Sequence, residues 1–230
     1  TIARWAPTCR FIGLSATVED PEKLARWLAP DAEVVRANGG VEADISIMKS
    51  RERIPWSGHS GRFAAQEVYE AIREAKLPLV FVNTRSQAEL LFQELWRVHE
   101  DALPIALHLG SLDVAQRRKM EHAMAAGQLR GVVCTSTLDL GIDWGDVDLV
   151  IQMGAPKGAA RLIQRIGRAN HRMDEASRAL LVPTNRFEVL ECRAAEAAVS
   201  AGELDSEGRQ WGALDVLAQH IMGRACGEGF

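Results

Sequence analysis

Apolar residues in this chain fall into two kinds of segment that follow one another in turn. Short continuous runs, such as residues 79–82 and 131–134, alternate with longer stretches in which apolar residues recur every three or four positions. A short continuous run is typical of a buried parallel strand, and the longer spacing is typical of an amphipathic helix. The alternation therefore predicts an α/β fold, with a parallel sheet that helices cover on both faces.

The same pattern assigns most of the chain to individual elements. Helices are predicted at residues 63–75, 87–99, 114–126, 159–169, 185–201 and 214–222. Strands are predicted at residues 10–14, 79–82, 105–108, 131–134, 147–153 and 179–182, and extended segments at 33–36 and 41–48. Asp20 followed by Pro21 is typical of a helix N-cap and first turn, so a further helix is expected to begin there and to end before Pro30.

The composition is that of a soluble globular protein. With 47% apolar residues in a chain of 230, a sizeable core can be buried, and no run reaches the roughly 18 apolar residues that would span a membrane. Four cysteines without a C-x-x-C pair and six scattered histidines predict reduced thiols in the cytoplasm and no metal site. The first residues lack the features of a secretory signal and are expected to lie inside a longer polypeptide.

Residues 157–172 form a basic run in a chain whose formal net charge is −4. The run holds five Lys or Arg residues and no acid, and Arg165, Arg168 and Arg172 are spaced three and four residues apart. On a helix, this spacing places the guanidinium groups along one face, where they can converge on a single anion. An isolated basic helix is more often a solvated face, but here a hydroxyl-rich loop at residues 135–145 precedes it between two apolar runs. This order indicates a lobe that presents nucleotide and nucleic acid at the carboxyl ends of its strands.

Five segments carry a resemblance to a known family. They read F-I-G-L-S-A-T at residues 11–17, L-V-F-V-N-T-R at 79–85, A-L-H-L-G-S at 106–111, T-S-T-L-D-L-G-I-D-W-G at 135–145 and Q-R-I-G-R-A-N-H-R at 164–172. The sequence resembles the superfamily 2 helicases, and among them the large helicase-related (Lhr) proteins, most closely the bacterial ligase-associated DEXH-box branch. A single segment is a weak signal, but five in the family's order, over nearly the whole chain, are a strong one.

The resemblance implies a domain organisation and an activity. Residues 1–37 would end a first RecA-like lobe, 38–61 would link the lobes, 62–202 would form a second RecA-like lobe of the P-loop NTPase type, and 203–230 would begin a winged-helix domain. The activity would be that of an ATP-dependent 3′-to-5′ DNA helicase in DNA repair, acting on single-stranded DNA or on DNA with a single-stranded tail. A DNA ligase and a nuclease would be its partners.

The implied cofactor is ATP with Mg²⁺, for which the chain carries only part of a site. It contains neither a G-x-x-x-x-G-K-[ST] phosphate loop nor a D-E-x-H motif. The Mg²⁺ ligands are therefore expected in an upstream lobe, and the chain alone is expected to be inactive.

By the same resemblance, the basic run supplies the catalytic residues. Arg168 would be the first arginine finger, whose planar, permanently charged fork contacts the γ-phosphate and stabilises charge in the transition state. Gln164 would sense the nucleotide. The second finger is either His171 or Arg172, and the permanent charge of arginine favours Arg172.

Other residues of the motifs would bind the nucleotide or couple the two sites. Gly141 would give backbone access and Gly167 would let the helix approach closely. Asp143 would accept hydrogen bonds from the ribose, although a loop-capping aspartate is the alternative. Ser15 and Thr17 would couple the ATP site to the nucleic-acid track.

Polar residues directly follow three of the predicted strands. Thr84 and Arg85 follow the first of the three, Ser111 follows the second, and the third is followed by Thr135, Ser136 and Thr137. Hydroxyl groups and backbone amides at strand ends can bind nucleic-acid phosphates without reading base identity. For each of these residues, helix capping is an equally good interpretation.

Two other functions stay open at this point. The lobe could belong to an RNA helicase of the same superfamily, because phosphate contacts do not distinguish RNA from DNA. It could also be a non-catalytic nucleic-acid-binding module, and ATP turnover measured with and without an upstream lobe separates that function from the motor.

Overall fold

The chain folds into two compact units. The computed structural model describes residues 6, 8–15, 18, 20–36, 41–99, 101–139, 147–169, 176–204 and 214–227. The larger unit comprises Ala37–Leu204, and the smaller one comprises Thr1–Arg36 with Asp205–Phe230. None of the helices in the described ranges is long and apolar enough to cross a membrane.

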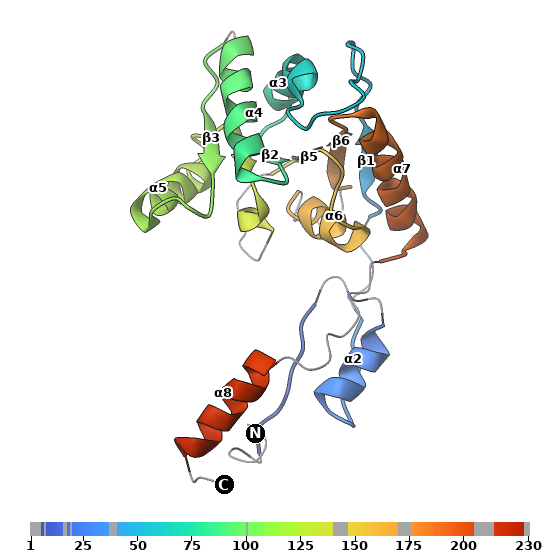
Figure 1. Cartoon of the computed structure of the whole chain (residues 1–230), viewed down its shortest axis with the longest axis vertical. Coiled ribbons are helices and arrows are strands. Elements are labelled where there is room, and N and C mark those ends of the chain that lie inside the picture. The colour runs from blue at the N-terminus through green and yellow to red at the C-terminus, as the bar shows by residue number, and fades with distance from the viewer. Residues whose placement is uncertain are drawn as a thin grey trace. The chain divides into compact units, whose positions relative to one another are not determined.

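A six-stranded parallel sheet forms the centre of the larger unit (Figure 1). Its strands are β1 (Asp44–Ile47), β2 (Pro78–Phe81), β3 (Ile105–His108), β4 (Gly131–Cys134), β5 (Leu149–Met153) and β6 (Arg178–Val182), in the spatial order β1-β6-β5-β2-β4-β3. Because all six strands run in the same direction, their carboxyl ends lie along one edge of the sheet.

Helices cover both faces of this sheet, as Figure 1 shows. One face is covered by η1 (Arg62–Ala64), α3 (Ala65–Glu74) and α4 (Arg85–Val98), and the other by α5 (Val114–Ala125), α6 (Ala159–Ile166) and α7 (Arg186–Ala201). The alternation of side chains along β2 separates the two cores: Val80 packs under α3 and α4, whereas Leu79 and Phe81 pack on the opposite face. This arrangement confirms the predicted α/β fold.

Polar side chains near the carboxyl ends of the strands start the next helices. Thr84 caps α4, Asp113 caps α5 and Asn185 caps α7, each by accepting hydrogen bonds from backbone N–H groups of the first helical turn. Gly202, with φ 69°, ends α7 in the left-handed region that favours glycine. The turns between strands and helices are therefore specified locally.

The smaller unit agrees with the sequence prediction only in part. Helix α2 (Pro21–Leu28) begins at the Asp20 cap as predicted, and α8 (Leu214–Ala225) covers the predicted C-terminal helix. The predicted strand at residues 10–14 is wrong: this segment has no regular structure, and the side chains of Ile12 and Leu14 are exposed. An apolar run forms a strand only when a neighbouring strand satisfies its backbone groups, and the described part of this unit contains none.

Most ends of helices and strands in the larger unit lie within two residues of the prediction, and two differences are larger. Residues 44–47, predicted to be extended within the linker, are β1, the edge strand of the sheet, and pair with β6. Helix α6, predicted to reach residue 169, ends at Ile166 because the chain turns at Gly167.

Candidate nucleotide and nucleic-acid site

The predicted phosphate-binding residues lie along the carboxyl edge of three neighbouring strands. Thr84 and Arg85 follow β2 and Ser111 follows β3, while η2 (Ser136–Leu138) directly follows Thr135 at the end of β4. Since β2, β4 and β3 are adjacent in the sheet, the structure brings these loops to one common edge. Such an edge is where ligands bind in open α/β sheets.

The first of these loops is occupied by local interactions. The Thr84 hydroxyl accepts a hydrogen bond from the Gln87 backbone N–H (3.2 Å), and the Thr84 backbone N–H donates one to Gln87 Oε1 (3.1 Å), which together form a capping box. Arg85 is exposed, and its Nε donates to Glu89 Oε1 at 2.7 Å. Thr84 therefore serves as a helix cap, and part of the Arg85 charge is compensated within its own helix.

Within the loop after β4, the Thr137 side chain connects η2 to the end of β3 through a contact with His108. Its Oγ1 lies 2.7 Å from Nδ1 of His108. Burial lowers the pKa of His108 below its usual value of 6.5, so this imidazole stays neutral at pH 7. Ser136 and Ser111 are exposed, whereas Thr135 is half-buried. The hydroxyls open to a ligand at this edge are therefore chiefly those of the two serines.

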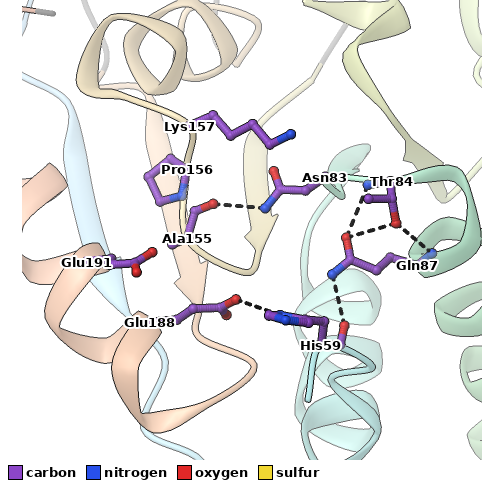
Figure 2. A pocket seen from close by; sticks show the side chains of 9 residues that line it. All are labelled: His59, Asn83, Thr84, Gln87, Ala155, Pro156, Lys157, Glu188 and Glu191. Carbon is purple, nitrogen blue, oxygen red and sulfur yellow. Dashed lines mark hydrogen bonds and ion pairs between the residues drawn. The ribbon is translucent and has the colours of Figure 1, made fainter. Parts of the chain in front are cut away.

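A pocket of about 520 Å³ lies beside the same edge (Figure 2). It is lined by His59, Asn83, Thr84, Gln87, Ala155, Pro156, Lys157, Glu188 and Glu191. Asn83 Nδ2 donates to the Ala155 carbonyl (2.9 Å), which joins the loops after β2 and β5. Lys157 is exposed and adds a cation to the edge next to Thr84.

The buried acid of this pocket is held by the protein itself. Glu188 Oε2 accepts hydrogen bonds from both the backbone N–H and the hydroxyl of Thr184, each at 2.7 Å. Its Oε1 lies 3.1 Å from Nδ1 of His59. Glu188 thus fixes the start of α7 to the loop that precedes η1.

Helix α6 places its basic side chains differently from the prediction. Arg165 is buried: its Nε donates to Asp139 Oδ1 at 2.9 Å, its Nη1 donates to Gln152 Oε1, and its guanidinium lies 4.7 Å from the centre of the Phe81 ring. Arg165 and Arg168 therefore do not converge on one anion as predicted, because a carboxylate distant in sequence draws Arg165 into the core.

The other predicted residues of α6 lie at its carboxyl end, near the surface. Arg168 follows the last helical turn and is half-buried, and its Nε makes a long hydrogen bond of 3.5 Å to the Gln164 carbonyl. Gln164 is half-buried as well. Gly167 is exposed with a φ of −64°, and an added Cβ would come no closer than 3.4 Å to the Ile163 carbonyl oxygen. The larger unit by itself thus leaves room for a side chain at Gly167.

Several predicted residues cannot be compared with the structure. Gly141, Asp143, His171, Arg172 and Thr17 lie outside the described residues. The remaining coupling residue, Ser15, is exposed in the smaller unit. Within the described ranges, no group of three or more His, Cys, Asp or Glu side chains gathers to hold a metal ion.

The sequence prediction missed three residues around Arg165. Asp139 belongs to the hydroxyl-rich loop, Gln152 interrupts an otherwise apolar strand, and Phe81 ends β2. The signal available in the sequence was Gln152, because a polar residue in a fully buried strand requires a polar partner. Its partner is Arg165.

Residues 64–173 match the helicase conserved C-terminal domain. Together with the RecA-like sheet, this match defines the class: the chain belongs to the superfamily 2 helicases and contains their C-terminal lobe. Within the class, the chain is of the Lhr type. It is 33% identical to ATP-dependent helicase Lhr-Core protein 2 of Thermococcus barophilus over 226 residues, which cover 93% of this chain and 26% of that protein.

Two further proteins with similar sequences are also Lhr helicases. ATP-dependent helicase Lhr-Core of Methanothermobacter thermautotrophicus is 32% identical over 93% of this chain and 26% of that protein. The structure of Mycobacterium smegmatis helicase Lhr bound to ssDNA and AMP-PNP superposes with a TM-score of 0.81 at 34% identity, covering 94% of this chain and 29% of that chain. The chain spans about a quarter of the length of these curated relatives.

Proposed function

We propose that this chain is the second motor lobe of an ATP-dependent 3′-to-5′ DNA helicase that acts in DNA repair. The observation that carries the proposal is the common edge on which the loops after β2, β3 and β4 present polar groups. It is supported by similarity to an Lhr helicase whose structure holds ssDNA and AMP-PNP. The proposal also includes action in the cytoplasm and, from the Lhr branch that the sequence resembles, a DNA ligase and a nuclease as partners.

The residues at the end of α6 fit a role opposite a nucleotide held by another lobe. Arg168 is half-buried, and among the described residues its guanidinium makes one long hydrogen bond, to a carbonyl oxygen of its own turn. Within that part of the chain, it can therefore turn towards an anion without breaking a strong contact. ATP with Mg²⁺ would supply the phosphoryl group and its charge compensation. In the proposed cycle, closure of the two lobes brings Arg168 to the γ-phosphate, with Arg172 or His171 as the second finger.

The edge of the sheet would grip one strand of DNA by its phosphates. Ser111 and Ser136 offer exposed hydroxyls, and Arg85 and Lys157 offer exposed cations. Contacts of this kind hold the backbone and leave base identity unread. Opening and closing of the lobes would then shift these phosphate contacts along the DNA strand.

The nucleotide role is tested by ATP turnover. The chain alone should not hydrolyse ATP, whereas a polypeptide that also contains the first lobe should do so when single-stranded DNA is added. In that polypeptide, Arg168→Ala should lower kcat by about 10³-fold or more, the range for arginine fingers. Arg193→Ala, which removes an exposed arginine of α7, is the matched control. A kcat of Arg168→Ala within threefold of the control would move Arg168 to a structural role.

The nucleic-acid role is tested by the salt dependence of binding. If the edge holds about three phosphates with cations, log affinity for single strands should fall with log salt at a slope of about −2, from roughly −0.7 per phosphate. Lys157→Ala should flatten the slope by about 0.7, and Arg85→Ala by less, because Glu89 already compensates Arg85. If the wild type, Lys157→Ala and Arg85→Ala give equal slopes, the side chains of Lys157 and Arg85 face away from the DNA strand. Parallel titrations with DNA and RNA of one sequence test the DNA preference.

A further inference from the structure

We infer that Arg165 is a positioning residue that couples the phosphate-binding loop after β4 to the arginine finger Arg168. The inference rests on the proposed function, because it gives that motor a physical connection between its nucleic-acid edge and its nucleotide site. Asp139, which directly follows η2 (Ser136–Leu138) in this loop, is the group through which Arg165 acts.

Arg165 is fixed in both position and orientation. Its side chain is 3% exposed and that of Asp139 is 8% exposed, and the Nε–Oδ1 distance between them is 2.9 Å. Nη2 lies 3.5 Å from the other carboxylate oxygen, so the contact is two-pronged. Nη1 binds Gln152 of β5, and the face of the guanidinium lies against Phe81 of β2. A rotation of the guanidinium in any direction would break at least one of these contacts.

One end of the connection is the hydroxyl-bearing loop. Asp139 directly follows η2, and its backbone N–H donates to the Ser136 carbonyl at 3.2 Å. Its carboxylate also lies 3.8 Å from Nε of Arg161, one turn earlier on α6. Asp139 therefore holds two arginines of α6, and a displacement of the loop is transmitted to the helix at two points.

The other end of the connection is the finger. The Arg168 backbone N–H donates to the Arg165 carbonyl at 2.9 Å, so the turn that carries Arg168 is built on Arg165. A phosphate that draws the loop after β4 would move Asp139, then Arg165, and with it the Arg168 backbone. Lysine could not take the place of Arg165, because a single ammonium cannot bind a carboxylate at two points, contact Gln152 and stack on Phe81 at once.

A purely structural ion pair is the competing explanation. Such a pair would stabilise the fold, and its loss would lower every activity of the protein in proportion. Coupling makes a different prediction. Loss of the Arg165–Asp139 contact lowers the stimulation of ATP turnover by DNA more than it lowers turnover without DNA.

The experiment measures kcat with and without a single-stranded oligonucleotide in the polypeptide that contains both lobes. Arg165→Lys and Asp139→Asn should each lower the ratio of stimulated to unstimulated kcat by about 2- to 30-fold, the range found for mutations along contact networks. Glu94→Gln is the matched control: this mostly buried carboxylate of α4 pairs with Arg62 (3.0 Å) and Arg97 (3.2 Å), and it should leave the ratio unchanged. An unchanged ratio of stimulated to unstimulated kcat, even if both rates fall, would overturn the coupling.

Hydrogen exchange on the 230-residue chain gives a second readout that does not depend on turnover. Oligonucleotide binding should increase the protection of backbone amides 164–169 in the wild-type chain, and Arg165→Lys should abolish this increase. If the wild-type chain binds the oligonucleotide without any change at these amides, the coupling is refuted even if the Asp139 variant fails to fold.

Arg168→Ala separates this inference from the proposed function. If the polypeptide with both lobes does not hydrolyse ATP, the motor role itself fails, and if Arg168→Ala has no effect on turnover, the finger role proposed for Arg168 fails. If it abolishes turnover while the Arg165 and Asp139 variants keep the wild-type ratio, only the coupling fails.

Discussion

The buried ion pair between Asp139 and Arg165 provides the sharpest test of the energetics of this lobe. Asp139→Ala leaves a guanidinium that is 3% exposed without its carboxylate. Removing one partner of a buried pair costs about 3–5 kcal/mol, because the remaining charge is neither solvated nor paired. With a slope of about 2 kcal/mol per M in urea, a loss of about 4 kcal/mol lowers the unfolding midpoint by about 2 M.

The matched control is the exposed pair Arg85–Glu89. Its N–O distance is 2.7 Å, shorter than the 2.9 Å of the buried pair, but its side chains are 64% and 43% exposed. An exposed i,i+4 pair is worth only about 0.3–0.5 kcal/mol, so Glu89→Ala should shift the midpoint by about 0.2 M. Burial and not distance thus sets the order of the two effects.

Urea unfolding of the 230-residue chain, followed by circular dichroism, measures both variants. A double replacement of Asp139→Leu with Arg165→Met should cost less than Asp139→Ala alone, because it removes both buried charges together. The reasoning is refuted if Asp139→Ala shifts the midpoint no further than Glu89→Ala does.

Three other properties follow from the structure. Burial lowers the pKa of His108 below 6.5, so its contribution to stability is complete above about pH 6.5 and is lost as the pH falls further; His108→Gln should flatten the dependence of unfolding free energy on pH between 5 and 7. Burial raises the pKa of Cys192 to about 12, so iodoacetamide at pH 8 should label the exposed Cys226 far faster than Cys192. Peptide mass spectrometry measures both labelling rates, and denaturation should remove the difference between them. Gly61→Ala should cost about 1–2 kcal/mol in thermal unfolding because φ is +63° and the new Cβ meets a core methionine methyl at 2.5 Å, whereas Gly167→Ala should stay within about 0.5 kcal/mol.

The sheet could be predicted from the sequence because its strands are specified locally. β3 and β4 were predicted to the residue: β3 is a short, mainly apolar run that begins directly after Pro104, and β4 is one that lies between Arg130 and Thr135. The segment at residues 10–14 has the same local pattern and forms no strand, because strand formation depends on a neighbour that periodicity does not reveal.

The candidate site was predictable in part. The loops with polar residues follow adjacent strands, so their common edge could be inferred once a parallel sheet was expected. The orientation of the Arg165 side chain could not be inferred, because its partner Asp139 is 26 residues away in sequence. The spacing along a helix predicts the same face for Arg165 and Arg168. The end of α6 at Ile166 then places Arg168 beyond the helix, where helical periodicity no longer determines the direction of its side chain.

The edge strand β1 has a consequence for how the chain acquires its fold. It pairs with β6, and the contact from the Ser46 hydroxyl to the Ala179 carbonyl joins residues 133 positions apart. Contacts between residues so distant in sequence require a costly loop closure and form slowly. During synthesis at about 5–20 residues per second, β1 leaves the ribosome roughly 7–27 seconds before β6 does. Through that interval its backbone lacks its native partner, so we expect the nascent lobe to depend on chaperones most strongly until β6 emerges.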